Sequence, residues 1–180
     1  MKVKILLIIC ISYLYGCVIT QEGTINKHIN LPENIKKIYV PVFKIGLNVY
    51  DPNINYLLTQ EIVTQFNLDG SLIVVSKVEE ADAIIDGVVK NYIKEAIEFD
   101  EQNLPILYRV SIEAEITFRD NKNGQKLWSD NEEKLYAITT YSDRVPPIET
   151  EFIAQKRVIE ELAIKIVRRA IYGWSDLKKE

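Results

Sequence analysis

The stretch that decides the fold is Tyr108-Arg109-Val110-Ser111-Ile112-Glu113-Ala114-Glu115-Ile116-Thr117-Phe118-Arg119, in which apolar and polar residues alternate without a break. Successive side chains of a β-strand point to opposite faces, so one face of this strand is apolar and the other is polar. An antiparallel sheet with one covered side buries the apolar face and leaves the polar face in water. The sequence therefore predicts a sheet that is packed on one face only.

Segments on both sides of this stretch supply further strands. Asn123-Gly124 is a strong hairpin signal, so the strand after it should pair antiparallel with the alternating strand. A turn over residues 100–105 precedes the alternating strand. In the first strand of the domain, Pro41 removes a backbone donor and indicates an edge position or a strand end. The expected strands, in chain order, cover residues 35–43, 72–76, 83–99, 108–119 and 126–140.

Two segments have apolar side chains at three- and four-residue spacing, which is typical of an amphipathic helix. The first covers residues 53–67, with Asn53 as its expected N-cap and Asp69-Gly70 as its stop. The second covers residues 149–171, and Gly173 is a plausible stop. Its expected apolar stripe consists of Phe152, Ile159, Leu162, Ala163, Ile166, Val167 and Ala170.

The element order β-α-β-β-β-β-α predicts an α/β (α+β) two-layer sandwich, in which a mixed, mostly antiparallel sheet carries both helices on one face. The open face would then hold Arg109, Glu113 and Arg119. The chain has 180 residues, of which 47% are hydrophobic, and this suits one domain with a real core. We expect four parts: a signal peptide (1–16), a lipidated tether (17–33), a single domain (34–174) and a polar tail (175–180).

The first seventeen residues have the pattern of a secretory signal. Two lysines precede an apolar run over residues 5–15, which is short for a membrane-spanning helix of roughly 20 residues. The run ends in Leu14-Tyr15-Gly16-Cys17, which resembles the bacterial lipobox, although a smaller residue usually stands where Tyr15 is. In that family the cysteine thiol takes a diacylglycerol and the chain is cleaved just before it. A plain signal peptide with an incidental cysteine is the alternative.

Cleavage before Cys17 would have two further consequences. Cys10 would be lost with the leader, so the mature chain could form no internal disulfide. Val18 would follow the lipidated residue, and this is compatible with the outer membrane, because Asp at that position favours retention in the inner membrane. The expected location is therefore the outer membrane, through a lipid anchor.

The sequence offers little for catalysis. The only histidine, His28, lies in the expected tether, where no Ser-His or Cys-His catalytic set can be built around it. Paired carboxylates can do acid–base work, and Glu113 and Glu115 share the wet face, with Glu95 and Glu98 expected near them. Charged residues on a solvated sheet face are a far commoner arrangement, so we expect no enzyme.

Metal ions, cofactors and nucleic acids are also not expected. Asp51, Asn53 and Asn55 hint at calcium, but the loop lacks the Gly and the distal Glu of a calcium-binding hand. A formal net charge of -4 with no block of Lys or Arg disfavours nucleic acid. Several basic residues on or beside the sheet could hold phosphates if they cluster: Lys36, Lys37, Arg109, Arg119, Lys126, Lys134 and Arg144.

Four blocks of the chain have a characteristic order. They are Leu31–Phe43 (LPENIKKIYVPVF), Leu57–Val63 (LLTQEIV), Ala81–Gly87 (ADAIIDG) and Tyr108–Trp128. Together with the lipobox, this series resembles the lipopolysaccharide-assembly lipoproteins, the LptE family. The resemblance covers nearly the whole mature chain.

The resemblance implies a domain that sits inside the lumen of a large outer-membrane β-barrel of the LptD type. There it would act as a plug and assembly factor and help to deliver lipopolysaccharide to the outer leaflet. No catalytic residues come with the family. Arg109, on a strand, and Arg144, in a late loop, are the candidates for contact with lipopolysaccharide phosphates.

Two alternatives remain at this stage. Strand-then-helix openings of the Tyr-Val-Pro-Val-Phe kind also occur in envelope lipoproteins that assemble secretion pores or activate cell-wall synthases. A hydrolase that uses Glu113 and Glu115 is the weaker alternative. A neighbouring gene for a very large outer-membrane barrel would favour the role as a barrel plug. Loss of activity in a folded Glu113→Gln variant would favour the hydrolase.

Overall fold

The computed structural model describes residues 31–129 and 135–173. Cys17, His28 and Lys134 lie outside the described residues. The strands are β1 (Lys37–Tyr39), β2 (Lys44–Val49), β3 (Ile73–Val74), β4 (Ala83–Phe99), β5 (Pro105–Asp120), β6 (Lys126–Ser129) and β7 (Leu135–Tyr141). The helices are α2 (Ile54–Asp69) and α3 (Glu151–Tyr172), with a short 3-10 turn η1 (Val78–Glu80).

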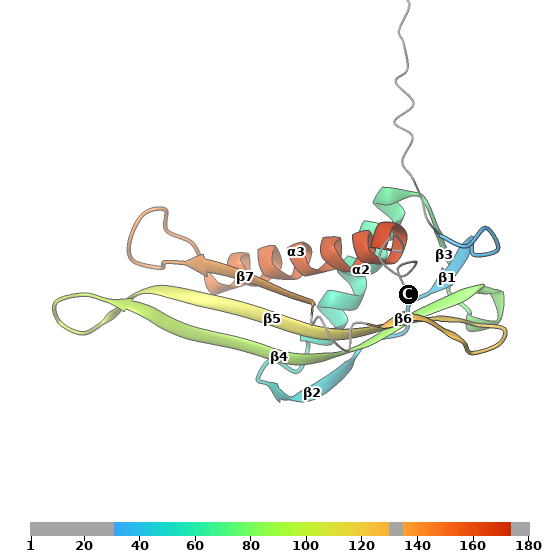
Figure 1. Ribbon diagram of the computed structural model, residues 1–180. Coiled ribbons are helices and arrows are strands. Elements are labelled where there is room, and N and C mark those ends of the chain that lie inside the picture. The colour runs from blue at the N-terminus through green and yellow to red at the C-terminus, as the bar shows by residue number, and fades with distance from the viewer. Residues whose placement is uncertain (1–30, 130–134, 174–180) are drawn as a thin grey trace, which may run out of the picture.

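The long antiparallel hairpin of β4 and β5 is the centre of the sheet. Along its outer edges lie four short strands: β1 and β2 run parallel to β4, while β6 and β7 run antiparallel to β5. β3 adds to β1 in parallel. The sheet is thus mixed and mostly antiparallel, and both helices lie on one side of it (Figure 1). This confirms the two-layer α+β architecture.

Two expected strands are each divided. The first ends before Pro41, and a second strand, β2, follows in a stretch where we expected no further strand. Tyr39 pairs with Ile84 and Lys44 pairs with Val88, so five residue steps on one side match four on β4. The extra residue is a bulge around Pro41, which has no N–H to give to the ladder. Likewise, the strand expected at 126–140 consists of β6 and β7, which pair with different stretches of β5.

The helix boundaries agree with the expected ones within two residues, but their caps differ. Asn53 makes no side-chain cap on α2, so that expectation was wrong. The Asp51 carboxylate instead accepts a hydrogen bond from the Asn53 backbone N–H at 2.9 Å. Thr150 caps α3 by accepting from the Ile153 N–H. Gly70 ends α2 with a left-handed φ of 71°, as the Asp69-Gly70 signal predicted.

The core lies between the helices and the apolar face of the hairpin. On β5 the alternation holds, since Val110, Ile112, Ala114, Ile116 and Phe118 are all buried. They meet the inner faces of both helices, formed by Ile54, Leu58, Ile62 and Phe66 of α2 and Val158, Leu162 and Ile166 of α3. Phe152 does not join them and is 64% exposed, because it lies on the outer side of the first turn of α3. No described helix is both long and apolar enough to cross a membrane.

Candidate functional site

The open face of the β4–β5 hairpin carries a row of matched polar side chains. Each pair joins β4 to β5, and the charged members are between about one third and one half exposed. Three of the pairs join opposite charges, and the fourth joins a carboxylate to a neutral amide. The pairs are Asp86–Arg119 (2.9 Å), Lys90–Glu115 (3.2 Å), Asn91–Glu113 (2.7 Å) and Glu95–Arg109 (3.1 Å).

The carboxylates of this face do not form an acid–base pair. Glu113 and Glu115 share the face as expected, but one accepts a hydrogen bond from the Asn91 amide and the other pairs with Lys90. Glu95 pairs with Arg109 and Glu98 lies opposite Leu107, so the expectation that they gather near Glu113 was wrong. The two strands therefore hold these carboxylates apart, each with its own partner, so that no two of them share a proton.

Both arginines proposed for phosphate contact lie toward the end of the hairpin that is far from β1 and β3. Arg109 Nη1 contacts Glu95 Oε1, and Arg144 Nη1 contacts Asp100 Oδ2 at 3.0 Å. Arg144 also donates to the Pro105 carbonyl at 3.4 Å. Backbone N–H groups of the hairpin turn, chiefly that of Leu104, and the Arg144 charge hold the pKa of Asp100 below its usual value. Each arginine therefore already has a carboxylate partner.

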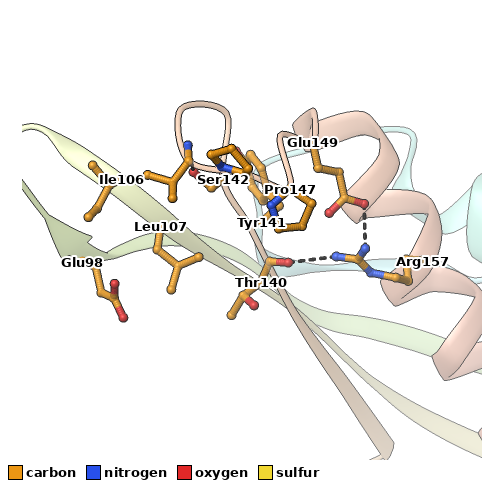
Figure 2. Close-up of a pocket in the computed structure, with 11 residues that line it drawn as sticks. Glu98, Ile106, Leu107, Thr140, Tyr141, Ser142, Pro147, Glu149 and Arg157 are labelled. Carbon is orange, nitrogen blue, oxygen red and sulfur yellow. Dashed lines mark hydrogen bonds and ion pairs between the residues drawn. The ribbon is translucent and has the colours of Figure 1, made fainter.

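A pocket of about 260 Å³ opens between the end of β7, the β7–α3 loop and the edge of β5 (Figure 2). Its apolar lining consists of Ile106, Leu107, Val145, Pro146 and Pro147. Arg157 of α3 forms one side and fixes the loop, with three hydrogen bonds: to Thr139 Oγ1 (2.9 Å), Glu149 Oε1 (2.6 Å) and the Thr140 carbonyl (2.8 Å). Sequence reasoning missed Arg157, because a basic residue on an amphipathic helix usually lies in solvent.

A second polar cluster ties the N-terminus of α3 to the sheet. Glu151 accepts hydrogen bonds from the Tyr50 hydroxyl at 2.7 Å and from Lys94 Nζ. Lys94 lies over the ring of Tyr108, which stacks on Tyr141 at 5.2 Å. The bond from Lys94 lowers the pKa of Glu151 and raises that of Lys94. The tyrosines are scattered along the sequence, so only the fold could reveal this cluster.

The hint of calcium finds no support in the geometry. The Asp51 carboxylate accepts from the Asn53 N–H and from Gln155 Nε2, while the Asn55 amide turns inward and donates to the Phe43 carbonyl. Within residues 31–129 and 135–173, no group of three or more His, Cys, Asp or Glu side chains could hold a metal ion.

Comparison with known proteins gives a family match and several fold relatives. The model of the LptE family, described as lipopolysaccharide-assembly, matches residues 35–170. No curated protein sequence matches the chain. Among solved structures, protein XCC0632 from Xanthomonas campestris is 11% identical with a TM-score of 0.58, over 81% of this chain and 89% of its own.

Two further structures have a similar fold. The uncharacterized lipoprotein B from Nitrosomonas europaea is 15% identical with a TM-score of 0.52, over 81% of this chain and 86% of its own. The protein CT253 from Chlamydia trachomatis is 9% identical with a TM-score of 0.50, over 76% of this chain and 98% of its own. At these identities the likeness concerns the fold alone.

Proposed function

The chain belongs to the LptE lipopolysaccharide-assembly family, and from this premise we propose that it plugs a large outer-membrane β-barrel of the LptD type. In that position it would help the barrel to assemble and would aid delivery of lipopolysaccharide to the outer leaflet. The role is one of binding and positioning, with no bond made or broken by the protein itself.

The open face of the sheet is the observation that carries this proposal. Large outer-membrane barrels have a polar interior, so a plug must present polar groups to the wall. Moving an unpaired charge out of water is costly, whereas a charge that keeps its partner loses less. Because Arg109, Lys90 and Arg119 each already hold a carboxylate, this face could enter a confined polar lumen with its charges matched.

We also propose that Cys17 carries the lipid that holds the protein at the outer membrane. Two or more acyl chains make membrane anchoring stable, which a single chain does not. In a Cys17→Ser variant the protein should move from the membrane fraction to the soluble fraction. Membrane association equal to that of the wild type would mean that lipid on Cys17 is not the anchor.

The central test is extraction of the tagged native protein in a mild detergent, followed by mass spectrometry of co-purifying proteins. We expect a large outer-membrane barrel in stoichiometric amount. A Ser111→Trp variant, which adds bulk to the middle of the open face, should recover much less barrel. Gln125→Trp, in the exposed β5–β6 turn, is the matched control and should recover the normal amount.

Other results of the same extraction would overturn the proposal. Recovery of secretion subunits or cell-wall synthases without a barrel would assign the chain to a periplasm-facing module of another envelope system. A role without catalysis would also be contradicted if the wild type processed lipopolysaccharide and Glu113→Gln lost that activity. The variant would have to fold normally and recover the normal amount of barrel.

A further inference from the structure

Large apolar side chains are exposed together at the end of the molecule that is far from β1 and β3. Phe99 (51% exposed) is the last residue of β4, and Leu104 (50%) lies in the β4–β5 turn. Val145 (46%) and Ile148 (67%) lie in the β7–α3 loop. We call this surface, with the pocket beside it, the distal end. Such groups of exposed apolar residues commonly mark interaction sites.

The two loops of the distal end are joined into one surface. The ion pair between Arg144 and Asp100 connects the β7–α3 loop to the hairpin turn at 3.0 Å. Arg157 holds the other end of the same loop through Glu149 and the Thr140 carbonyl. The apolar side chains are therefore presented by fixed loops, and little ordering is needed when a partner binds.

The size of the pocket favours protein side chains over a whole small molecule. Pockets for drug-sized ligands span roughly 300–1,000 Å³, and this one measures about 260 Å³. Its walls are apolar side chains of β5 and of the loop, while Glu98 contributes a carboxylate at one side (Figure 2). One long side chain with an apolar stem and a cationic end would match both features.

The charge of the distal end disfavours an anionic lipid surface. Residues 98–105 and 142–149 contain five acidic residues and one basic residue, Arg144, which is already paired with Asp100. Arg157, which lines the pocket, is paired with Glu149, so three acidic residues remain in excess. An excess of negative charge repels phospholipid and lipopolysaccharide phosphates and attracts a basic rim.

The position of the distal end also disfavours contact with a lipid surface. The described chain begins at Leu31 beside β1, whereas the tip of the hairpin lies at the opposite end of the molecule (Figure 1). The 17 residues of β4 alone span about 55 Å at about 3.3 Å per residue. The distal end therefore faces away from the point where a lipidated tether would join.

We infer that the distal end docks onto a protein surface that is apolar at its centre and lined with Lys or Arg at its rim. Phe99, Leu104 and Ile148 bury themselves in the apolar centre, and the pocket receives one basic side chain beside Glu98. This inference rests on the proposed function in one respect: the partner on which we test it is the barrel.

The experiment places a photo-crosslinking phenylalanine analogue at position 104 of the distal end and, separately, at position 111 of the open face. The full chain is expressed in cells that contain the barrel. We expect a covalent adduct with the barrel from position 104. The triple variant Glu98→Lys, Glu101→Lys, Asp143→Lys should lower the yield of that adduct at least fivefold.

A matched variant controls for the change of net charge. Glu33→Lys, Glu79→Lys and Glu80→Lys alter the same number of exposed acidic residues at the other end of the molecule. That variant should leave the adduct from position 104 unchanged. An equal loss in both variants would overturn the inference, because the attraction would then depend on total charge alone.

The remaining outcomes separate this inference from the proposed function. Adducts from position 111 but not from position 104 would overturn the docking inference and leave the barrel-plug proposal intact. Adducts from neither position would overturn both. An adduct from position 104 with lipopolysaccharide or phospholipid instead of protein would overturn the inference in favour of a lipid contact.

Discussion

The β4–β5 hairpin has two halves that use similar residues in opposite ways. In the half beside β1 and β6, apolar side chains such as Ile85, Val89 and Phe118 are fully buried under the two helices. In the distal half, Phe99 and Leu104 are only half buried. The comparison teaches that only the first half of this hairpin builds the core, while the second half keeps its apolar surface for contact.

The boundary between the halves is the N-terminus of α3. Glu151, in the first turn of the helix, is held by Tyr50 and by Lys94 of β4. Between the N-terminus of α3 and the tip of the hairpin, no described helix lies over β4 (Figure 1). The cluster around Glu151 therefore marks where the core ends and the distal surface begins.

The largest expected effect comes from the same substitution made in each half. Phe118→Ala should destabilise the domain by about 3–5 kcal/mol, because it removes a fully buried aromatic ring. Phe99→Ala should change stability by about 0.5 kcal/mol or less, since its ring is half exposed. Urea unfolding of both variants measures the difference. Similar losses in the two variants would mean that the distal half is part of the core.

The next largest difference in stability between the two halves should come from substitutions that enlarge a side chain of β4. A Cβ on Gly87 would lie 2.6 Å from the Glu115 carbonyl oxygen and 2.7 Å from the Phe43 ring, so something must move. Overpacking of this kind costs about 1–3 kcal/mol, which we expect for Gly87→Ala. Ala96→Val, in the distal half of β4, should cost about 0.5 kcal/mol or less. A lower urea midpoint for Ala96→Val than for Gly87→Ala would contradict the comparison.

The sequence predicted the half that builds the core better than the half that does not. The alternation in β5 depends on burial, so Val110 to Phe118 revealed both the strand and its inner face. Phe152 was wrongly placed in the apolar stripe of α3, because spacing alone does not tell which turn of a helix meets the sheet. β2 was missed because Pro41 and Gly46 are usual loop residues, and only the extra residue around Pro41 lets the pairing with β4 resume.

A smaller effect is expected at the boundary between the halves, and it depends on pH. The pKa of Glu151 is lowered by its bond from Lys94, so its contribution to stability is present above its ordinary value of 4.5 and lost as pH falls through the lowered value. The pKa of Lys94 is raised, so its contribution is present below 10.5 and lost as pH rises through the raised value. The pair is thus intact near neutral pH.

Glu151→Gln tests this boundary. Because the pair is more than one third exposed, solvent screening limits the expected loss at neutral pH to about 0.5–1 kcal/mol. Urea unfolding should show that the difference from the wild type shrinks as pH falls below 4.5, the ordinary pKa of a glutamate side chain. A loss of stability in Glu151→Gln that does not change with pH would mean that Glu151 stabilises the domain through packing and not through its charge.

The candidate site was harder to predict than the fold. Arg109 and Arg144 do lie toward the same end of the molecule, as a phosphate site would require. Their carboxylate partners, however, are separated from them by 14 and 44 residues in the sequence. Glu95 meets Arg109 only because a register shift near Asn91 sets the pairing of β4 with β5. Pairing of this kind depends on backbone irregularities that residue types do not reveal.

The smallest expected effect concerns these two arginines. Each guanidinium already contacts a carboxylate, and acidic residues outnumber basic ones in the loops of the distal end, so any attraction for phosphate is partly cancelled. An exposed ionic contact contributes about 0.2–1 kcal/mol, which is roughly a 1.4- to fivefold change in affinity. The double variant Arg109→Glu, Arg144→Glu should therefore bind lipopolysaccharide only a few fold more weakly in low salt, and salt should remove the difference.

Arg119→Glu provides the control at the other end of the open face, because Arg119 is paired with Asp86 in the same way and is similarly exposed. An equal loss of lipopolysaccharide binding in Arg119→Glu would mean that phosphate is attracted by the summed charge of the whole open face and not by particular arginines. Unchanged binding in the double variant would remove Arg109 and Arg144 as contacts. A loss confined to the double variant would place lipopolysaccharide between the distal half of the open face, which holds Arg109, and the β7–α3 loop, which holds Arg144. It would then lie beside the acidic residues that we assign to contact with a protein partner.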